Sequence, residues 1–296
     1  MNIFITGATG FLGQHIARQC ATEGHHVLCL RRATSPHTTL NGVTWVTSDS
    51  SQWESEVKAF CPDVLIHAAW SGVDAKGRND GKVQQENVEM TEHLLHMHPY
   101  KQVVMLGSQD EYGRIDSEVD ENQPLRPLSE YAKAKISCCE HLQAYAGKHG
   151  LAWQWLRIFS VYGPGQRPQW LIPSVIGHCL RGEAMDTTRG EQRYSYLYVA
   201  DFARAVVSTL GKKGKSGIYN LSSAVPVTLS TLFHTIRQLT ASTTEFRPTL
   251  PYRENQSMII LGNANKFIHA FGPFERTSLE DGLKATIEYI QNNQQL

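Results

Sequence analysis

A tyrosine and a lysine four residues apart form the pair in this sequence that is best suited to proton transfer. Tyr131 and Lys135 fall in the first turns of a helix that we expect to begin after Ser129 and to end before Gly150. Side chains four residues apart share one face of a helix. A tyrosine ordinarily titrates at about pH 10, and a neighbouring ammonium group lowers that pKa by favouring the phenolate. The same spacing also occurs on solvated helix faces, so the pair needs further support.

Ser108 is the second residue whose position suggests chemistry. It closes the apolar run Met105-Leu-Gly-Ser108 and is followed by a polar turn. The carboxyl end of a strand is where a doubly wound sheet presents its residues to ligands. A hydroxyl there can hydrogen-bond a substrate carbonyl oxygen or the alkoxide formed from it. The alternative is that the serine satisfies the backbone amides of the turn.

The third feature is a glycine turn at the start of the chain. An apolar run from Met1 ends in Thr6-Gly7-Ala-Thr-Gly10-Phe11-Leu12-Gly13, after which a helical pattern begins. A strand, a tight glycine turn and a helix N-terminus together offer free N–H donors to a nucleotide pyrophosphate. We therefore predict a dinucleotide site here, with a purely structural turn as the alternative.

These residues require a sheet that brings strand ends together. Apolar runs alternate with amphipathic stretches through the first half of the chain, which predicts a parallel, doubly wound α/β sheet of the Rossmann type. After about Gly163 the alternation becomes irregular, and residues 217–221 read as one more strand of the main sheet. We expect a dinucleotide-binding domain in 1–165 plus about 200–223, and a smaller interleaved substrate lobe in 166–199 and 224–296. The expected strands are 3–6, 27–30, 43–46, 64–67, 103–106 and 153–158, and the expected helices are 10–23, 87–96, 129–148 and 279–291.

The three features occur in the order and context of one enzyme family. The sequence resembles the extended short-chain dehydrogenase/reductases, in the branch of nucleotide-sugar epimerases, dehydratases and reductases. The resemblance implies that Ser108, Tyr131 and Lys135 carry out the chemistry, and that Lys135 also holds the nicotinamide ribose. It further implies cofactor contacts from the glycine turn and from Ala68 and Ala69. The matching motifs include Leu65-Ile-His67-Ala-Ala69, Asn87-Val88, Leu156-Arg157, Val161-Tyr-Gly-Pro-Gly165-Gln166, Leu171-Ile-Pro173, Arg193-Tyr-Ser-Tyr-Leu-Tyr-Val199-Ala-Asp201 and Ser278-Leu-Glu-Asp-Gly282-Leu.

The residues after the second expected strand favour NADP over NAD. Dinucleotide sites that prefer NAD place an acidic residue there, whereas an arginine suits the 2′-phosphate of NADP. This sequence has Arg31-Arg32, and a guanidinium binds phosphate well. A solvated basic pair is the alternative. Asp49 resembles the adenine contact of the family.

The choice of reaction follows from the cofactor and from the residues next to Ser108. Dehydratases of this family carry Asp-Glu directly after the Ser/Thr, and here Gln109 and Asp110 stand there. Trp70 resembles a feature of the sugar-nucleotide 4-ketoreductases. Arg193 and Arg253 resemble the arginines that bind the substrate diphosphate. We therefore expect NADPH-dependent reduction of a nucleotide-linked 4-keto-6-deoxy sugar, with Trp70, Gln109 and Asp110 also contacting the substrate.

Other functions remain open at this point. The first alternative is a nucleotide-sugar 4-epimerase that retains NAD. The second is a non-catalytic NADP-sensing protein, and the complete set of Ser108, Tyr131 and Lys135 argues against it. A dehydrogenase of steroid-like or flavonoid-like substrates is the third.

Composition narrows the partners and the compartment. The 28 basic and 28 acidic residues cancel, so we expect no nucleic-acid partner, and no apolar stretch is long enough to cross a membrane. The glycine turn occupies the place where the apolar centre of a signal peptide would lie. Six cysteines without metal spacing read as reduced thiols of a cytoplasmic protein. His93, His96 and His98 are weak metal ligands at best, so we expect no metal, and a homodimer is implied by the family resemblance alone.

Overall fold

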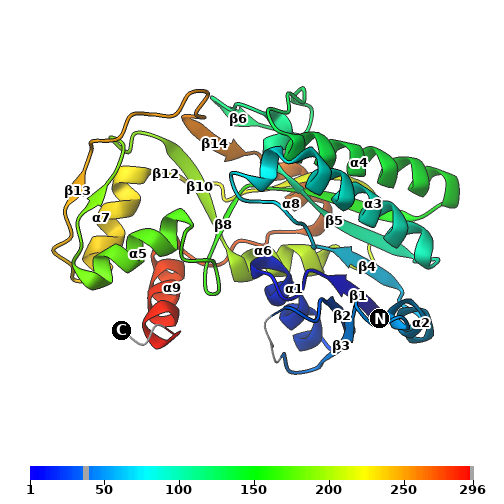
Figure 1. The fold of residues 1–296 in the computed structure, drawn as a ribbon. Coiled ribbons are helices and arrows are strands. Elements are labelled where there is room, and N and C mark those ends of the chain that lie inside the picture. The colour runs from blue at the N-terminus through cyan, green and yellow to red at the C-terminus, as the bar shows by residue number, and fades with distance from the viewer. Residues whose placement is uncertain (36–39, 294–296) are drawn as a thin grey trace.

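Seven parallel strands form the sheet around which the molecule is built (Figure 1). A computed structural model describes residues 1–35 and 40–293. The strand order is β11-β7-β5-β4-β1-β2-β3, and every neighbouring pair is parallel. The expected Rossmann-type sheet is thus confirmed, including the late strand that returns to its edge. The strands are β1 (Asn2–Thr6), β2 (His26–Arg31), β3 (Val43–Thr47), β4 (Val64–His67), β5 (Gln102–Ser108), β7 (Ala152–Ile158) and β11 (Gly217–Leu221).

Helices cover both faces of this sheet because successive residues of the buried strands point to opposite sides. In β1, Ile3 and Ile5 pack in a cluster with α1 and α6, whereas Phe4 packs in a second cluster with α3 and α4. Both faces are therefore apolar, which explains why the strands appear in the sequence as unbroken apolar runs. The helices are α1 (Phe11–Thr22), α2 (Trp53–Phe60), α3 (Gly81–Met97), α4 (Glu130–His149) and α6 (Val199–Ser208).

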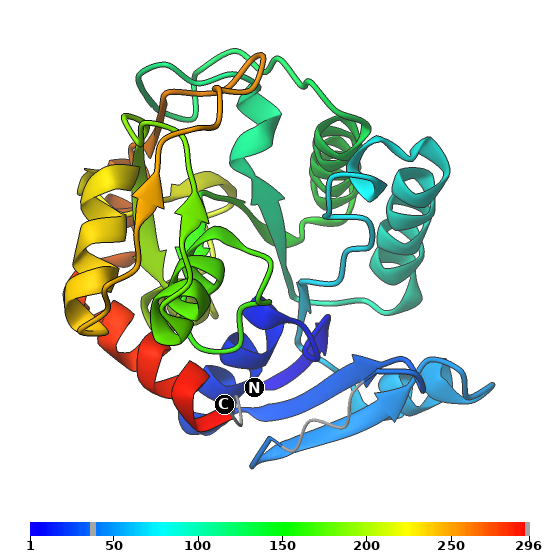
Figure 2. The ribbon, with the colours of Figure 1, turned by 60° about the vertical axis from the view of Figure 1, so that its left-hand side comes forward.

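A second group of elements lies beside the sheet (Figures 1 and 2). Three helices pack around a separate apolar cluster that includes Val175, Leu232 and Leu283. A smaller sheet of order β12-β10-β14-β6 joins this group, and β8 pairs with β10. The sequence-based domain boundaries stay a prediction. The elements are β6 (Glu118–Val119), β8 (Ser160–Tyr162), β9 (Met185–Asp186), β10 (Arg193–Tyr198), β12 (Pro226–Thr228), β13 (Phe246–Arg247), β14 (Ile259–Gly262), α5 (Leu171–Arg181), α7 (Leu229–Leu239) and α9 (Leu279–Asn293). Helix α8 (Asn265–Phe271) packs on the main sheet instead, where Phe267 joins the cluster of Ile3 and Ile5.

The helix expected at 87–96 begins earlier than predicted. Asp80 caps α3 by accepting the backbone N–H groups of Lys82 and Val83 at 3.1 and 3.2 Å, so the helix starts at Gly81. Two short 3₁₀ helices, η1 (Gly77–Asn79) and η2 (Gln109–Tyr112), flank the carboxyl ends of β4 and β5. Both contribute side chains to the site described next.

Candidate active site

Ser108 ends β5 at the carboxyl edge of the sheet, and the turn that follows fixes it in place. Its backbone N–H donates to Glu111 Oε1 at 2.8 Å, and its own Oγ accepts the N–H of Asp110 at 3.2 Å. This reciprocal capping box begins η2. The hydroxyl thus accepts a hydrogen bond from a turn amide, and it lies near enough to the Tyr131 phenol to lower the pKa of that group. The serine is held rigidly beside the phenol.

Tyr131 stands in the first turn of α4, which Ser129 caps by accepting the N–H of Ala132 at 3.2 Å. Burial raises the pKa of Tyr131 above its ordinary value, and the hydrogen bond with Ser108 and the charge of Arg78 act in the opposite direction. A phenol in these surroundings can exchange a proton with a bound hydroxyl or carbonyl oxygen. The structure thus brings Ser108 and Tyr131 together, and their catalytic role stays a prediction.

Lys135 is buried, one turn further along α4. Its Nζ donates to the carbonyl oxygen of Leu106 at 2.7 Å and lies 3.4 Å from the ring centroid of Trp70. The distance from Nζ to the ring centroid of Tyr131 is longer, at 5.8 Å. Burial lowers the pKa of Lys135 to about 7. The contact of the ammonium group in this structure is therefore with Trp70 rather than with the phenol ring.

The glycine turn has the geometry of a backbone cradle. Gly7 has a φ of +77°, and a Cβ there would lie 2.5 Å from the backbone nitrogen of Ala69. Gly10 caps α1 without a side-chain hydrogen bond, and Phe11 and Leu12 open the helix. The first N–H groups of α1 therefore point into the space at the strand ends without a side-chain partner at the cap. Such a cradle fits a dinucleotide pyrophosphate, which would take its place against these N–H groups and the helix dipole.

The cradle predicts the effect of a single methyl group. A Cβ at Gly13 would lie 2.2 Å from the carbonyl oxygen of Gly7, so Gly13→Ala must displace the turn. We expect affinity for the dinucleotide to fall at least about tenfold, measured by calorimetric or fluorescence titration. Gly147→Ala is the matched control, because Gly147 also lies in a helix and its Cβ would meet nothing within 4 Å. Unchanged affinity in Gly13→Ala would place the cofactor elsewhere.

The residues assigned to the adenosine end lie beyond β2. The guanidinium carbon of Arg31 lies 5.7 Å from the ring centroid of Trp45, and Arg32 is exposed. Asp49 Oδ2 accepts the N–H of Ala33 at 2.6 Å, so this carboxylate holds the loop that follows the two arginines. The arrangement leaves two guanidinium groups at the rim of the predicted adenosine pocket. Their roles in binding stay a prediction.

Comparison with known proteins decides the family. The sequence profile of the NAD-dependent epimerase/dehydratase family matches residues 3–222. The chain belongs to this family. A UDP-glucose epimerase of Bacillus subtilis, itself uncharacterised, is 24% identical over 99% of this chain and 98% of its own length. UDP-glucuronate 4-epimerase 1 of Arabidopsis thaliana is 26% identical over 98% of this chain and 76% of its own length.

Solved structures agree on the fold. UDP-glucose 4-epimerase of Thermotoga maritima, determined with UDP-glucose, superposes with a TM-score of 0.89 at 24% identity over 99% of both chains. MoeE5, determined with UDP-glucuronic acid and NAD, gives 0.85 at 25% identity over 99% of this chain and 100% of that one. The chain is therefore a member of an NAD-dependent enzyme family. Among the solved structures similar to it are complexes with a nucleotide sugar and with NAD.

Three of the residues expected to contact substrate, Trp70, Gln109 and Asp110, lie close to Tyr131 or to its neighbour Arg78. Trp70 lies against the catalytic pair, with its ring centroid 5.8 Å from that of Tyr131 in an edge-to-face arrangement. Gln109 donates to Asp110 Oδ1 at 2.6 Å, and the Asp110 carboxylate is paired with Arg78. Both side chains are thus engaged with neighbouring protein groups.

The two arginines assigned to the diphosphate lie in the second group of elements. Arg193 begins β10, and its N–H donates to the carbonyl oxygen of Met258 at 2.8 Å. The N–H of Arg253 donates to Gln256 Oε1 at 3.3 Å. Both arginine side chains are exposed. The structure does not bring either into contact with Ser108, Tyr131 or Lys135, and their binding role stays a prediction.

Sequence reasoning missed three charged residues at this site. Arg78 lies on the ring of Tyr131, with its guanidinium carbon 4.5 Å from the ring centroid. Glu111, fully buried behind Ser108, accepts from Arg157 Nε at 2.7 Å and from Trp155 Nε1 at 3.0 Å. A charged Arg157 inside the apolar strand β7 was the available signal, because a buried charge requires a partner.

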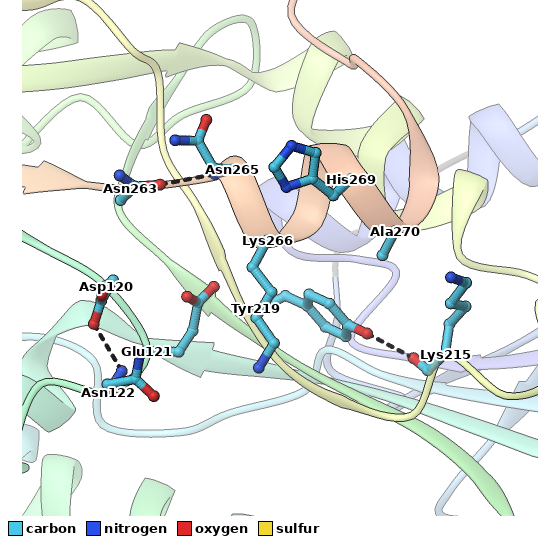
Figure 3. A pocket seen from close by; sticks show the side chains of 10 residues that line it. All are labelled: Asp120, Glu121, Asn122, Lys215, Tyr219, Asn263, Asn265, Lys266, His269 and Ala270. Atoms are coloured by element: carbon cyan, nitrogen blue, oxygen red, sulfur yellow. Dashed lines mark hydrogen bonds between the residues drawn. The ribbon is translucent and has the colours of Figure 1, made fainter.

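A cavity lies away from these residues. It has a volume of about 610 Å³ and is open to solvent between the turn after β6, the start of β11 and helix α8 (Figure 3). Its polar side chains include Glu121, Lys215 and Lys266, and acidic and basic groups are mixed (Figure 3). This lining differs from the set of Ser108, Tyr131 and Lys135 at the end of β5 and the start of α4, so Tyr131 remains our candidate active site.

The described residues contain neither a metal-binding cluster nor a membrane-spanning helix. Within residues 1–35 and 40–293, no group of three His, Cys, Asp or Glu side chains is arranged to hold a metal ion. His93 instead contacts Glu54 Oε1 at 3.0 Å, and His96 bonds the carbonyl oxygen of Glu92 at 2.8 Å. No helix among the described residues is long and apolar enough to span a membrane.

Proposed function

We propose that the protein transfers hydride at C4 of a nucleotide-linked sugar, and that it acts as a nucleotide-sugar 4-epimerase. The observation that carries this proposal is the meeting of Ser108 and Tyr131 at the sheet edge that also bears the glycine cradle. The names of its relatives, which include a UDP-glucose epimerase and a UDP-glucuronate 4-epimerase, support an epimerase better than a reductase.

The chain's own residues supply the proton chemistry. When bound, the nicotinamide supplies a hydride acceptor and donor. The phenolate form of Tyr131 takes the proton of the C4 hydroxyl as the alcohol is oxidised, and the phenol so formed returns a proton to the oxygen when the ketone is reduced. The Ser108 hydroxyl, held by the η2 turn, hydrogen-bonds the same oxygen and stabilises its developing charge. We infer that Lys135, one turn further along α4, binds the nicotinamide ribose when the cofactor is present.

A second candidate is the NADPH-dependent 4-ketoreductase expected from the sequence. Arg31 and Arg32, with no acidic residue at the end of β2, favour a cofactor that carries a 2′-phosphate. A dehydratase is less well supported, because the Asp110 carboxylate is paired with Arg78 and is not free to act with Gln109 as an acid–base pair.

One experiment separates these reactions. The purified protein is denatured to release and identify any bound nicotinamide, and is then assayed with UDP-glucose and with a nucleotide-linked 4-keto-6-deoxy sugar plus NADPH. Bound NAD and conversion of UDP-glucose to UDP-galactose without added cofactor support the epimerase. Stoichiometric oxidation of NADPH by the keto sugar favours the reductase and overturns the epimerase. Binding of NADP without turnover of either substrate contradicts both and favours the sensing function.

Cofactor preference gives a separate prediction. We expect Arg31→Ala/Arg32→Ala to weaken NADPH binding by about 10- to 100-fold, which corresponds to loss of a charged hydrogen bond, and to leave NADH binding unchanged. Titration with both nucleotides measures the ratio. Arg18→Ala is the control, because Arg18 is exposed on α1. If the NADPH to NADH ratio is the same in the double variant, these arginines do not bind the phosphate.

The remaining partner predictions are coarser. We infer a nucleotide-sugar substrate from the similar structures that contain UDP-glucose or UDP-glucuronic acid. A homodimer stays a prediction that size-exclusion chromatography with light scattering would test.

A further inference from the structure

Arg78 has a position that neither the family motifs nor the catalytic set accounts for. It belongs to η1, in the loop between β4 and α3, and its guanidinium carbon lies 4.5 Å from the ring centroid of Tyr131. The same side chain forms an ion pair with Asp110 of η2. Exposed fractions of 28% for Arg78 and 22% for Asp110 place the pair at the mouth of the site rather than on open surface.

The loop that carries Arg78 is held by buried hydrogen bonds. The side-chain amide of Gln84, which is 2% exposed, donates to the carbonyl oxygens of Gly72 at 3.0 Å and Gly77 at 2.8 Å. The Gln84 Oε1 accepts the indole N–H of Trp70 at 2.9 Å. A Cβ at Gly77 would lie 2.4 Å from the Cα of Gly72, so the two ends of the loop pass in direct contact. These contacts hold the backbone of the loop, and so they hold Arg78 next to the phenol ring.

We propose that Arg78 is a positioning residue for proton transfer, whose guanidinium lies against the ring of Tyr131 and stabilises the phenolate form of that ring. This inference rests on the proposed role of Tyr131. A cation on the face of an aromatic ring is attracted by the π electrons, and the attraction grows when the ring carries a negative charge. Arg78 is closer to the ring centroid than the ammonium group of Lys135 is, at 4.5 Å against 5.8 Å.

The other charged groups near the phenol are less well placed than Arg78 to stabilise the phenolate. The Lys135 ammonium group contacts Trp70 and a backbone carbonyl oxygen rather than the phenol ring, and burial lowers the pKa of Lys135. Glu111 opposes the phenolate from behind, but it is paired with Arg157. Asp110 faces Arg78 directly and offsets part of its charge.

This arrangement predicts that removing Arg78 and removing Asp110 shift the pKa of Tyr131 in opposite directions. Removing the cation in Arg78→Gln is expected to raise the pKa of Tyr131 by about one unit, and removing the anion in Asp110→Asn is expected to lower it. Arg78→Lys keeps the charge and should retain most of the effect. Lys76→Gln removes a cation from an exposed position of the same loop and should leave the pKa of Tyr131 unchanged.

The measurement is a pH titration of the full chain labelled with ¹³Cζ-tyrosine, followed by NMR. Tyr131→Phe identifies the resonance, and no substrate is needed, so the test is independent of whether the proposed reaction is right. A second readout is the pH profile of kcat/KM for whichever substrate proves active, in which the basic inflection should move with the NMR value.

Opposite shifts in Arg78→Gln and Asp110→Asn support the proposal. Unchanged titration in Arg78→Gln, or shifts of the same sign in both variants, overturns it and leaves the pair a structural link between η1 and η2. If Arg78→Gln fails to fold, Asp110→Asn decides alone, because a structural link predicts no decrease in the pKa of Tyr131.

Discussion

Replacing Tyr131 by phenylalanine is expected to lower kcat by about 10²- to 10⁴-fold while leaving dinucleotide affinity within a few-fold of the parent value. The variant removes only the phenolic hydroxyl, and the ring remains packed against Trp70 and Arg78. General acid–base catalysis by one positioned side chain contributes about this range of rate. Single-turnover measurement of hydride transfer separates the chemical step from binding.

The control for this variant is Tyr289→Phe. Tyr289 lies on α9 with 41% of its surface exposed, so it loses a phenolic hydroxyl without a contact to the site. If Tyr131→Phe retained near-parental turnover with the correct substrate, the phenol would not carry the proton, and the placement of the active site at the ends of β5 and α4 would be wrong. A loss of dinucleotide affinity equal to the loss of rate would instead indicate a damaged fold.

The sheet was predictable from the sequence because its strands are buried on both faces. Each of Ile3, Phe4 and Ile5 is 0% exposed, and side chains pointing in both directions meet apolar helices. An unbroken apolar run followed by a glycine turn therefore indicates strand, turn and helix together. Helix α2 was missed for the converse reason. Only Val57 among its eight residues is buried, so the helix has almost no periodic apolar signal.

The positions of the three candidate catalytic residues were predictable because two of them share a helix and the third ends a strand. Tyr131 and Lys135 share a helix, and Ser108 ends an apolar run. Spacing alone, however, misjudged where the ammonium group of Lys135 lies. Trp70 takes the position next to it, because the indole N–H is anchored by Gln84 on α3. No sequence pattern predicts that Trp70, Gln84 and Lys135 come together.

Arg78 and Glu111 could not be assigned from the sequence, since each acts through a partner distant along the chain. The partner of Glu111 is Arg157, 46 residues away. The contact of Arg78 with Tyr131 depends on the path of a loop that carries no periodic pattern. Such contacts arise only when the sheet order brings β4, β5 and β7 side by side.

The buried pair of Glu111 and Arg157 gives the largest expected effect on stability. Glu111→Gln keeps the volume of the side chain and removes its charge, which leaves the guanidinium of Arg157 buried at 3% exposure without a counter-ion. Breaking a buried pair in this way is expected to lower the free energy of unfolding by about 3–5 kcal/mol. Urea denaturation at fixed protein concentration, with the slope of the transition compared as well, measures this difference.

An exposed pair of similar geometry is the matched control. Lys133 Nζ lies 2.7 Å from Glu130 Oε1, with 59% and 43% of the two side chains exposed, so Glu130→Gln is expected to cost less than about 1 kcal/mol. If Glu111→Gln lowered the free energy of unfolding by no more than Glu130→Gln does, the buried carboxylate would not be what holds the Arg157 guanidinium. The double variant Glu111→Gln/Arg157→Met should be more stable than the sum of the two single losses predicts, because no unpaired charge remains.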